Sequence, residues 1–556
     1  MPPRPSRRKG GSGGAAGSGV DTNLSAHNPR DPYSAFQNLR TLLDGIKTSK
    51  HGMTPEEHRL SLHLLGIVEP FVGSSPNRKN LISQPYEILD EIVFHIDSKK
   101  DLLSFALTCE RMHGIIHPRH FEYRVISAKI SSLAVWRHLI GNKALARGVR
   151  RLEILDDRDT RAEVVPSGIK ESNEPESPYD VHGEQEGLLI DALKNLTTLS
   201  TFVWSCTHSP ICVDAIWPTL VQCEMLKDVQ VSDNLLFGAG SSSDTERAPT
   251  PSMRSVSLQS ASHAFGMSKN RSLTRVSDMI VERCPNLESL DVQCDVIKGA
   301  SKPQADEFLA SGRWPALRSL TLRSFWCSTH GLDAAASFLA DHVNLEVLHL
   351  DVGRSLNTAA FTLPPNSLPR LKELRSSKEV ALSILSCPCD VKRPVETIKG
   401  VNIAGAAWDP KFGEALKKHD IRRLELLRIN DIDDLRRLVD YVPKLTWLDV
   451  GQRANTKTGP ITIPNAGEWA AVLSKLPELT TFHGIHLFYE SPDRKLDAAS
   501  VSDQSKITKN NEIANVLAWK LPKLRRMDHW EDGSGKVMVI LREGDKVRWE
   551  VRRLKA

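Results

Sequence analysis

Apolar residues recur along most of this chain in a short unit, L-x-x-L-x-L. The clearest copies are Leu287-Leu290-Val292, Leu317-Leu320-Leu322 and Leu345-Leu348-Leu350. Their first leucines stand 30 and then 28 residues apart. The alternation inside each unit predicts a short strand with one face inward, and self-similarity at a period of this length predicts a solenoid.

Looser copies of the unit lie on both sides of these three. Before them come Val149-Leu152-Ile154, Leu199-Phe202-Trp204, Leu226-Val229-Val231 and Met253-Val256-Leu258. After them come Leu371-Leu374, Ile398-Val401-Ile403, Ile421-Leu424-Leu426, Leu445-Leu448-Val450, Leu479-Phe482 and Leu524-Met527. One stretch has a second possible register, Leu424-Leu427-Ile429. Each unit alone would leave its apolar face in water, so the units must stack.

The fold predicted for residues 126–530 is therefore a curved α/β solenoid, with a parallel strand face on one side and helices on the other. Two polar insertions interrupt it near residues 156–187 and 238–252, and their composition predicts mobile loops. Residues 531–556 alternate apolar positions on either side of a Glu-Gly-Asp turn, which predicts a hairpin near the last repeat.

The first part of the chain has helical spacing instead. Residues 1–31 lack the apolar residues that would offset backbone ordering and are predicted to be a disordered tail. Residues 32–75 predict two amphipathic helices. Residues 81–125 predict three short helices, the first with the apolar set Ile88, Leu89, Ile92, Val93 and Ile96. Their apolar faces exceed what a three-helix cluster can bury, so part of that surface is expected to be covered by a partner.

Four pieces of residues 81–125 carry a family resemblance: PYEILDEI from Pro85, DLL from Asp101, LTCERM from Leu107, and HP from His117. In this register the segment resembles an F-box, and the whole chain resembles fungal F-box proteins with C-terminal leucine-rich repeats. One position departs from the family, because Gln84 stands before the proline where Leu is usual. An ordinary helical cap on the following domain is the alternative.

The resemblance implies a partner and a role. It implies that the segment binds a Skp-type adaptor, and through it the core of a cullin-RING ubiquitin ligase, while the repeats bind a target protein. The chain would then be the substrate-recognition subunit of an SCF-type ligase for ubiquitin-dependent degradation, and not an enzyme itself. The adaptor-binding residues implied are Pro85, Glu87, Ile88, Leu89, Ile92, Leu102, Leu103, Leu107, Cys109 and Arg111. A repeat scaffold without ubiquitin transfer is the second interpretation.

The period-two alternation also predicts where a target would lie. The residues between the inward leucines must point outward onto the strand face. In the units considered, these are Gln230, Asp291, Gln293, Arg323, His349, Asp351, Trp447 and Asp449. Mixed charge around a tryptophan suits a protein partner better than a polyanion, although docking on a loop remains open.

Composition and charge narrow the function further. The net charge of +5 is slight for 556 residues and does not indicate nucleic-acid binding. The nine cysteines have no framework spacing and no long apolar run occurs, so we expect a cytoplasmic or nuclear protein without a membrane span. The cysteines and histidine at 206, 208 and 212, and the pair at 387 and 389, do not make a four-ligand zinc set. The acids at 156, 157 and 159 are interpreted as solvated charge. We predict no metal, cofactor or catalytic residue.

Overall fold

The computed structural model of the chain describes most of residues 23–553. The gaps are 29, 49–52, 73–80, 170–180, 210, 212, 234–252, 295–301, 353–360, 454–462, 491–499, 532–533 and 545, together with 261–283 apart from Leu273, Ser277, Ile280 and Val281. The predicted disordered tail up to residue 22 and the insertion at 238–252 lie outside the described residues. None of the helices in the described ranges is long and apolar enough to cross a membrane.

The chain divides into two compact units. The first contains residues 1–95 and 107–115, and the second contains residues 96–106 and 116–556. The segment predicted as an F-box is therefore shared between them: helices α3 (Tyr86–Phe94) and most of α5 (Glu110–Ile116) belong to the first unit, and α4 (Lys99–Ala106) belongs to the second.

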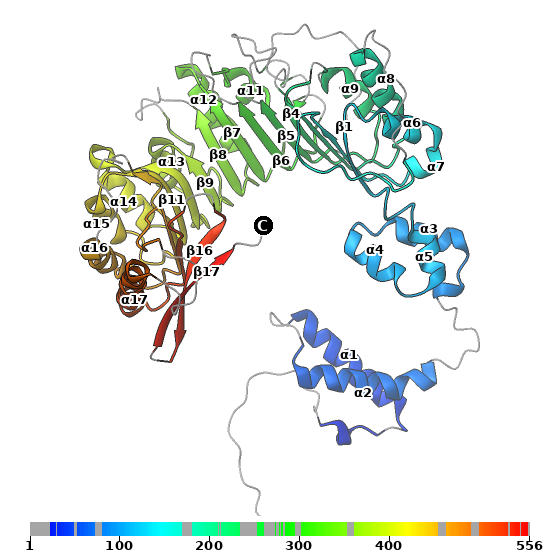
Figure 1. The fold of residues 1–556 in the computed structure, drawn as a ribbon, viewed down its shortest axis with the longest axis horizontal. Coiled ribbons are helices and arrows are strands. Elements are labelled where there is room, and N and C mark those ends of the chain that lie inside the picture. The colour runs from blue at the N-terminus through cyan, green and yellow to red at the C-terminus, as the bar shows by residue number, and fades with distance from the viewer. Residues whose placement is uncertain are drawn as a thin grey trace, which may run out of the picture. The chain divides into compact units, whose positions relative to one another are not determined.

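The first unit begins with a helical hairpin (Figure 1), preceded by the short η1 (Leu24–Ala26) and formed by α1 (Pro32–Thr48) and α2 (Pro55–Val72). Thr54 and Glu57 form a reciprocal cap at the start of α2: the Thr54 N–H donates to the Glu57 carboxylate at 2.8 Å, and the Glu57 N–H donates to the Thr54 hydroxyl at 3.2 Å. The buried core of this hairpin is small and consists of Ala35, Leu42, Leu60, Leu64, Ile67 and Val68. The 3-10 turn η2 (Leu81–Ser83) then precedes α3.

The described residues of the second unit form a 17-stranded sheet. Its strands are β1 (Val125–Lys129), β2 (Arg151–Leu155), β3 (Thr201–Cys206), β4 (Asp228–Asp233), β5 (Ser255–Ser260), β6 (Ser289–Cys294), β7 (Ser319–Phe325), β8 (Val347–Val352), β9 (Glu373–Ser376), β10 (Thr397–Asn402), β11 (Arg423–Ile429), β12 (Trp447–Asp449), β13 (Gln452–Arg453), β14 (Thr481–His483), β15 (Arg526–Asp528), β16 (Lys536–Glu543) and β17 (Lys546–Arg553). Strands β1 to β12 pair in parallel in chain order, β13 lies beside β11, and β14 and β15 continue from β12. Strands β15, β16 and β17 are antiparallel.

Helices return the chain from one strand to the next. They are α6 (Leu133–Gly141), α7 (Lys143–Ala146), α8 (Val181–Leu193), α9 (Val213–Leu220), α11 (Asp306–Ser311), α12 (Thr329–Asp341), α13 (Lys378–Ser386), η3 (Gly405–Ala407), α14 (Pro410–Lys417), α15 (Ile432–Val439), α16 (Ile463–Leu473) and α17 (Val501–Lys520). Within this unit the helices cover one face of the curved sheet and the other face is lined by strands (Figure 1). We call this second face the strand face. A parallel sheet with helices on one side is the α/β solenoid expected from the repeats.

The leucine positions of the repeats form the core between sheet and helices. Leu290, Leu320 and Leu348 are neighbours in register on β6, β7 and β8, and all three are fully buried. The same row continues through the late units, where Phe482 and Met527 are buried. The ambiguous stretch adopts the register Ile421-Leu424-Leu426, because Leu427 is 60% exposed. Repeated burial of one row of side chains is what stacks the units.

The insertion after β2 differs from the prediction. Ser127 on β1 exchanges two backbone hydrogen bonds with Val164, of 2.9 and 2.7 Å, and the Lys129 N–H donates to the Glu163 carboxylate at 2.5 Å. The prediction of a mobile loop is therefore corrected for residues 156–169, which close the open edge of β1. The reason is that their polar groups have backbone partners along that edge instead of water. Residues 170–180 of the same insertion lie outside the described residues.

Candidate functional site

Helix α3 has two apolar sides. Leu89 and Val93 are fully buried. Ile88 and Ile92, one position earlier in each case, are 50% and 37% exposed, and Tyr86 in the first turn is also exposed. A short helix needs only one apolar stripe to pack on its own domain. The second stripe is therefore surplus to the packing of the helix.

Arg111 forms hydrogen bonds to the segment that precedes α3. Its guanidinium donates to the carbonyl oxygens of Ile82 and Gln84, the second at 2.7 Å. This contact holds the turn before Pro85, where Leu81 and Ile82 are themselves exposed. The exposed apolar residues of the first unit in this region are Leu81, Ile82, Tyr86, Ile88, Ile92 and Leu107, and we call them the helical apolar set.

The ten residues implied as adaptor contacts fall into three groups. Pro85, Glu87, Ile88, Ile92, Leu103 and Leu107 are exposed and Cys109 is half-buried. Arg111 is exposed, but its guanidinium is used by the backbone of residues 82 and 84. Leu89 and Leu102 have no exposed surface, which corrects their assignment: they support their helices from inside and offer nothing for a partner to touch.

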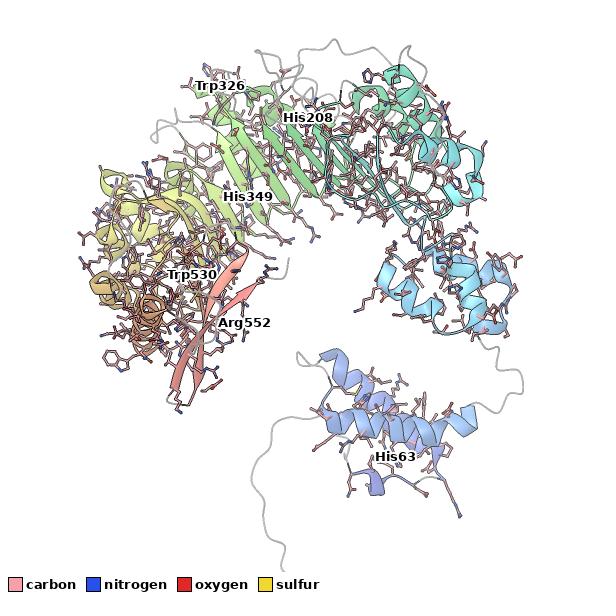
Figure 2. All side chains as sticks on the ribbon, in the orientation of Figure 1. His63, His208, Trp326, His349, Trp530 and Arg552 are labelled. Carbon is pink, nitrogen blue, oxygen red and sulfur yellow. The ribbon has the colours of Figure 1, made fainter. Side chains whose placement is uncertain are left out.

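The second candidate surface is the strand face. All eight residues expected there alternate with buried neighbours, as in β6, where Asp291 and Gln293 flank the buried Val292. Strand register places Asp291 on β6 beside Thr321 on β7, and Thr321 beside His349 on β8. Figure 2 labels His349 on the side of the sheet away from the helices. The alternation thus brings the predicted target residues to one face.

A chain of paired side chains crosses this face from β8 to β11. The His349 Nε2 lies 2.7 Å from a Glu373 carboxylate oxygen, which also accepts from Lys399 Nζ at 2.6 Å. Lys399 lies 3.8 Å from Glu425. Two nitrogens of Arg423 contact the Glu425 carboxylate: Nε donates at 2.9 Å and Nη2 lies at 2.7 Å. These pairs link side chains from four neighbouring strands.

The same chain continues through Trp447 to the end of the parallel sheet. The Arg423 guanidinium lies 4.0 Å from the centre of the Trp447 ring, a cation–π distance. On its other side Trp447 is 5.2 Å from the His483 ring, and His483 Nδ1 is 2.5 Å from Asp528. Trp447 is half-buried between these groups. It is therefore a fixed aromatic surface and not the freely exposed anchor expected from the sequence.

We call the connected set His349, Glu373, Lys399, Glu425, Arg423, Trp447, His483 and Asp528 the strand-face ladder. Six of its members were not predicted from the sequence: Glu373, Lys399, Arg423, Glu425, His483 and Asp528. A signal for them exists, since each occupies an outward position next to a buried repeat residue, as the eight expected residues do.

Protonation equilibria in the ladder reflect burial and pairing. Burial lowers the pKa of His349, and the hydrogen bond to Glu373 only partly opposes this. For Glu373 burial favours a higher pKa, but hydrogen bonds from Lys399 and His349 outweigh it and lower the pKa. Burial also raises the pKa of Asp449, beside the ladder, despite a hydrogen bond from the Gly451 N–H. The face thus holds a neutral histidine against an ionised glutamate at neutral pH.

We expect the solenoid to lose stability as the pH falls below about 6.5, the ordinary histidine pKa. Burial lowers the pKa of His342, whose Nε2 accepts from the backbone N–H of Trp314 at 3.0 Å and whose Nδ1 lies 2.6 Å from the Phe338 carbonyl oxygen. The unfolded chain therefore binds protons before the folded chain does, so stability is present above about 6.5 and is lost as the pH falls through the lowered pKa. Free energies of unfolding, measured by urea titration from pH 7.5 to 5.5, should decline. The decline should be shallower in His342→Gln, by up to about 1.4 kcal/mol per pH unit, and an equal slope in both proteins would contradict this source.

Other groups considered for chemistry have structural roles. Asp156 is buried and accepts from the N–H groups of Arg158 and His208, at 2.9 and 2.5 Å, so its interpretation as solvated charge is corrected. Cys206 is buried, and burial followed by the nearby acids raises its pKa well above the ordinary value. Cys212 lies outside the described residues. Among the residues that the structure describes, no group of three or more His, Cys, Asp or Glu could hold a metal ion.

Comparison with known proteins adds no argument about the fold or the function of this chain. No family model matches the chain, and no curated protein matches it either. Among solved structures, a leucine-rich-repeat protein of Leptospira interrogans matches with 12% identity and a TM-score of 0.21, over 61% of this chain and 92% of that chain. A TM-score this low carries no argument. The parallel strand pairing and the buried L-x-x-L-x-L positions themselves give this chain the fold of a leucine-rich-repeat solenoid.

Proposed function

We propose that this chain is a non-catalytic receptor that joins two proteins: a Skp-type adaptor at the helical apolar set and a target at the strand face. The observation that carries the proposal is the second apolar stripe of α3. Ile88 and Ile92 stay exposed while Leu89 and Val93 already supply the helix with a buried side. Exposed apolar residues gathered in one region indicate a protein interaction site.

The adaptor follows from the F-box resemblance, which covers residues 81–125. In this proposal the adaptor leads to a cullin-RING core, which supplies the catalysis. Holding a target beside a charged ubiquitin carrier raises its effective concentration, so this chain would need no chemistry of its own. Both recognition surfaces would then be required for one outcome, ubiquitin transfer to the target.

The strand face supports the target half of the proposal. Its ladder fixes long charged side chains in place before any partner arrives, which reduces the entropy lost on binding. Arg and Trp, which meet at Arg423 and Trp447, are the residue types most enriched among interface hot spots. A scaffold that uses the same face without ubiquitin transfer is the second candidate, favoured by the fold alone.

The deciding experiment is an affinity pull-down with proteomics. The tagged full-length chain is compared with a chain lacking residues 81–125, after circular dichroism has shown that the repeats of both are folded. Adaptor and cullin should copurify only with the full-length chain, while target proteins copurify with both. If neither adaptor nor cullin is enriched on the full-length chain, the ligase role is wrong and the scaffold role stands.

We expect target capture to depend on the strand face. Trp447→Ala, Arg323→Ala and His349→Ala each remove a side chain from this face, and loss of a hot-spot residue costs about 2 kcal/mol or more. The matched control is Trp519→Ala, because Trp519 is 78% exposed on the outer helix α17. Captured target is measured by quantitative mass spectrometry at equal bait and equal bound adaptor. Undiminished capture by all three strand-face variants would move the recognition site to another surface.

A further inference from the structure

The last strand of the sheet ends in an open edge. β17 pairs with β16 along all of Lys546–Arg553, and in the described part of the chain its other side has no strand or backbone partner. We propose that this edge binds an acidic, extended segment of a partner protein, which adds to the sheet as one more strand. Free N–H and C=O groups along an edge are a template for such pairing.

The opposite edge of the sheet, at β1, is covered by residues of the same chain. There the chain uses its own residues to cover β1, through the two hydrogen bonds between Ser127 and Val164 and through Glu163 on the Lys129 N–H. Both ends of this sheet would otherwise present free backbone groups. An edge left open at β17, in a molecule that closes the edge at β1, is available for a partner.

The core side of β17 is incompletely covered. Met538 and Ile540 on β16 are fully buried, and register places Val551 and Trp549 directly opposite them, on the same side of the hairpin. Trp549, Val551 and the neighbouring Val547 are nevertheless only half-buried. A strand beside β17 would cover these three with its own apolar residues. The segment that fits therefore has apolar side chains at every second position.

The other side of β17 is basic. Lys546, Arg548 and Arg552 alternate along it and Glu550 is the single acid among them. Arg552 pairs with Glu550, while the exposed Arg548 lies 3.3 Å from Glu543 on β16. Opposite charges on neighbouring strands stabilise pairing and like charges oppose it. The intervening positions of the bound segment are therefore acidic, and the occupant alternates acidic and apolar residues.

Two other occupants fit this edge less well. A second copy pairing antiparallel over the whole strand would set Lys546 against Arg553, so like charges would meet at both ends. A nucleic acid would satisfy the basic residues, but it has neither the alternating N–H and C=O groups that an edge requires nor side chains for Val547 and Trp549. Charges on an edge strand often prevent association. Here they reject neutral and basic strands while admitting an acidic one.

The experiment uses the full-length chain and a short fluorescent peptide that alternates glutamate and valine. We expect saturable binding by fluorescence anisotropy, weakened by added salt. The double variant Arg548→Glu/Arg552→Glu should bind at least about tenfold less tightly, because two favourable charge contacts become unfavourable. The control is Lys143→Glu/Arg147→Glu, which reverses two exposed charges, one at the start of α7 and one directly after its end, and should bind as the parent does. Circular dichroism and melting temperature verify the fold of each protein.

Three further probes decide the mode of binding. A peptide with glutamine in place of glutamate should bind weakly. Peptides N-methylated at alternate residues should differ, because only one set of N–H groups can point at β17. Equal binding by both methylated peptides, tighter binding of a single-stranded oligonucleotide than of the acidic peptide, or binding unchanged in Arg548→Glu/Arg552→Glu would each overturn the proposal. Because no adaptor is present in these assays, their result is independent of the receptor function proposed above.

Discussion

Replacing Ile88 and Ile92 with aspartate is expected to abolish capture of the Skp-type adaptor while leaving the chain folded. Ile88 and Ile92 are 50% and 37% exposed on α3, so burying the rest of either side chain on binding contributes roughly half of the about 1.5–3 kcal/mol of a fully exposed isoleucine. The double variant loses both contributions and forces two carboxylates into an apolar interface. We therefore expect at least about a hundredfold loss in affinity, since each factor of ten is about 1.4 kcal/mol. Surface plasmon resonance with purified adaptor measures it directly.

A matched control tests whether the loss of binding is specific to α3 or follows from placing aspartate at any exposed apolar position. Leu62 and Leu65 on α2 are also exposed and belong to the same unit of the structure. Leu62→Asp/Leu65→Asp should bind adaptor as the parent does. If instead Ile88→Asp/Ile92→Asp keeps parental affinity, α3 is not the contact and the F-box interpretation fails. An equal loss in both double variants would mean that the first unit has unfolded, which circular dichroism would reveal.

A substitution at Gln84 is expected to strengthen adaptor binding instead of weakening it. It is half-buried, its carbonyl is fixed by Arg111, and it stands where F-box proteins usually have Leu. Gln84→Leu should tighten adaptor binding, because a leucine adds apolar area at the edge of the helical apolar set. Unchanged affinity would place residue 84 outside the contact.

The repeats could be predicted from sequence because their signal is local. Period-two alternation within nine residues fixes which side chains face inward, so Leu290, Leu320 and Leu348 were expected in the core and are buried there. The stretch around Leu427 could not be settled in this way. Two registers satisfy the same alternation, and only packing against the neighbouring strand selects the one that leaves Leu427 exposed.

The strand-face ladder and the closed edge of β1 depend on contacts between distant residues. Which outward residue meets which is set by register between strands, so the link from Lys399 to Glu425 cannot be inferred from either unit alone. Likewise nothing local marks Glu163 as a partner for the Lys129 N–H, thirty-four residues away. Composition predicted a loop there, and the tertiary hydrogen bonds determine its position.

Arg393 is another residue whose role depends on contacts between distant segments. Arginine side chains are mostly exposed in proteins, yet Arg393 is only 3% exposed. Its Nε and Nη2 donate to the Ser367 carbonyl, at 3.0 and 2.8 Å, and its Nη1 donates to the Cys387 carbonyl at 2.8 Å. The guanidinium thereby joins the segment before β9 to the segment after α13. The Cys387 considered as a zinc ligand takes part in this structural contact.

Arg393→Met is expected to lower the free energy of unfolding by about 2–5 kcal/mol, because it leaves buried carbonyl groups without donors and removes three hydrogen bonds from a charged group. The adjacent Lys392 gives the control: it pairs with Asp420 at 3.0 Å on the surface, and exposed pairs contribute at most about 1 kcal/mol, so Lys392→Met should unfold at nearly the parental urea concentration. Urea titrations followed by circular dichroism compare the three proteins. A midpoint for Arg393→Met that matches Lys392→Met would show that water can replace the guanidinium between these two segments.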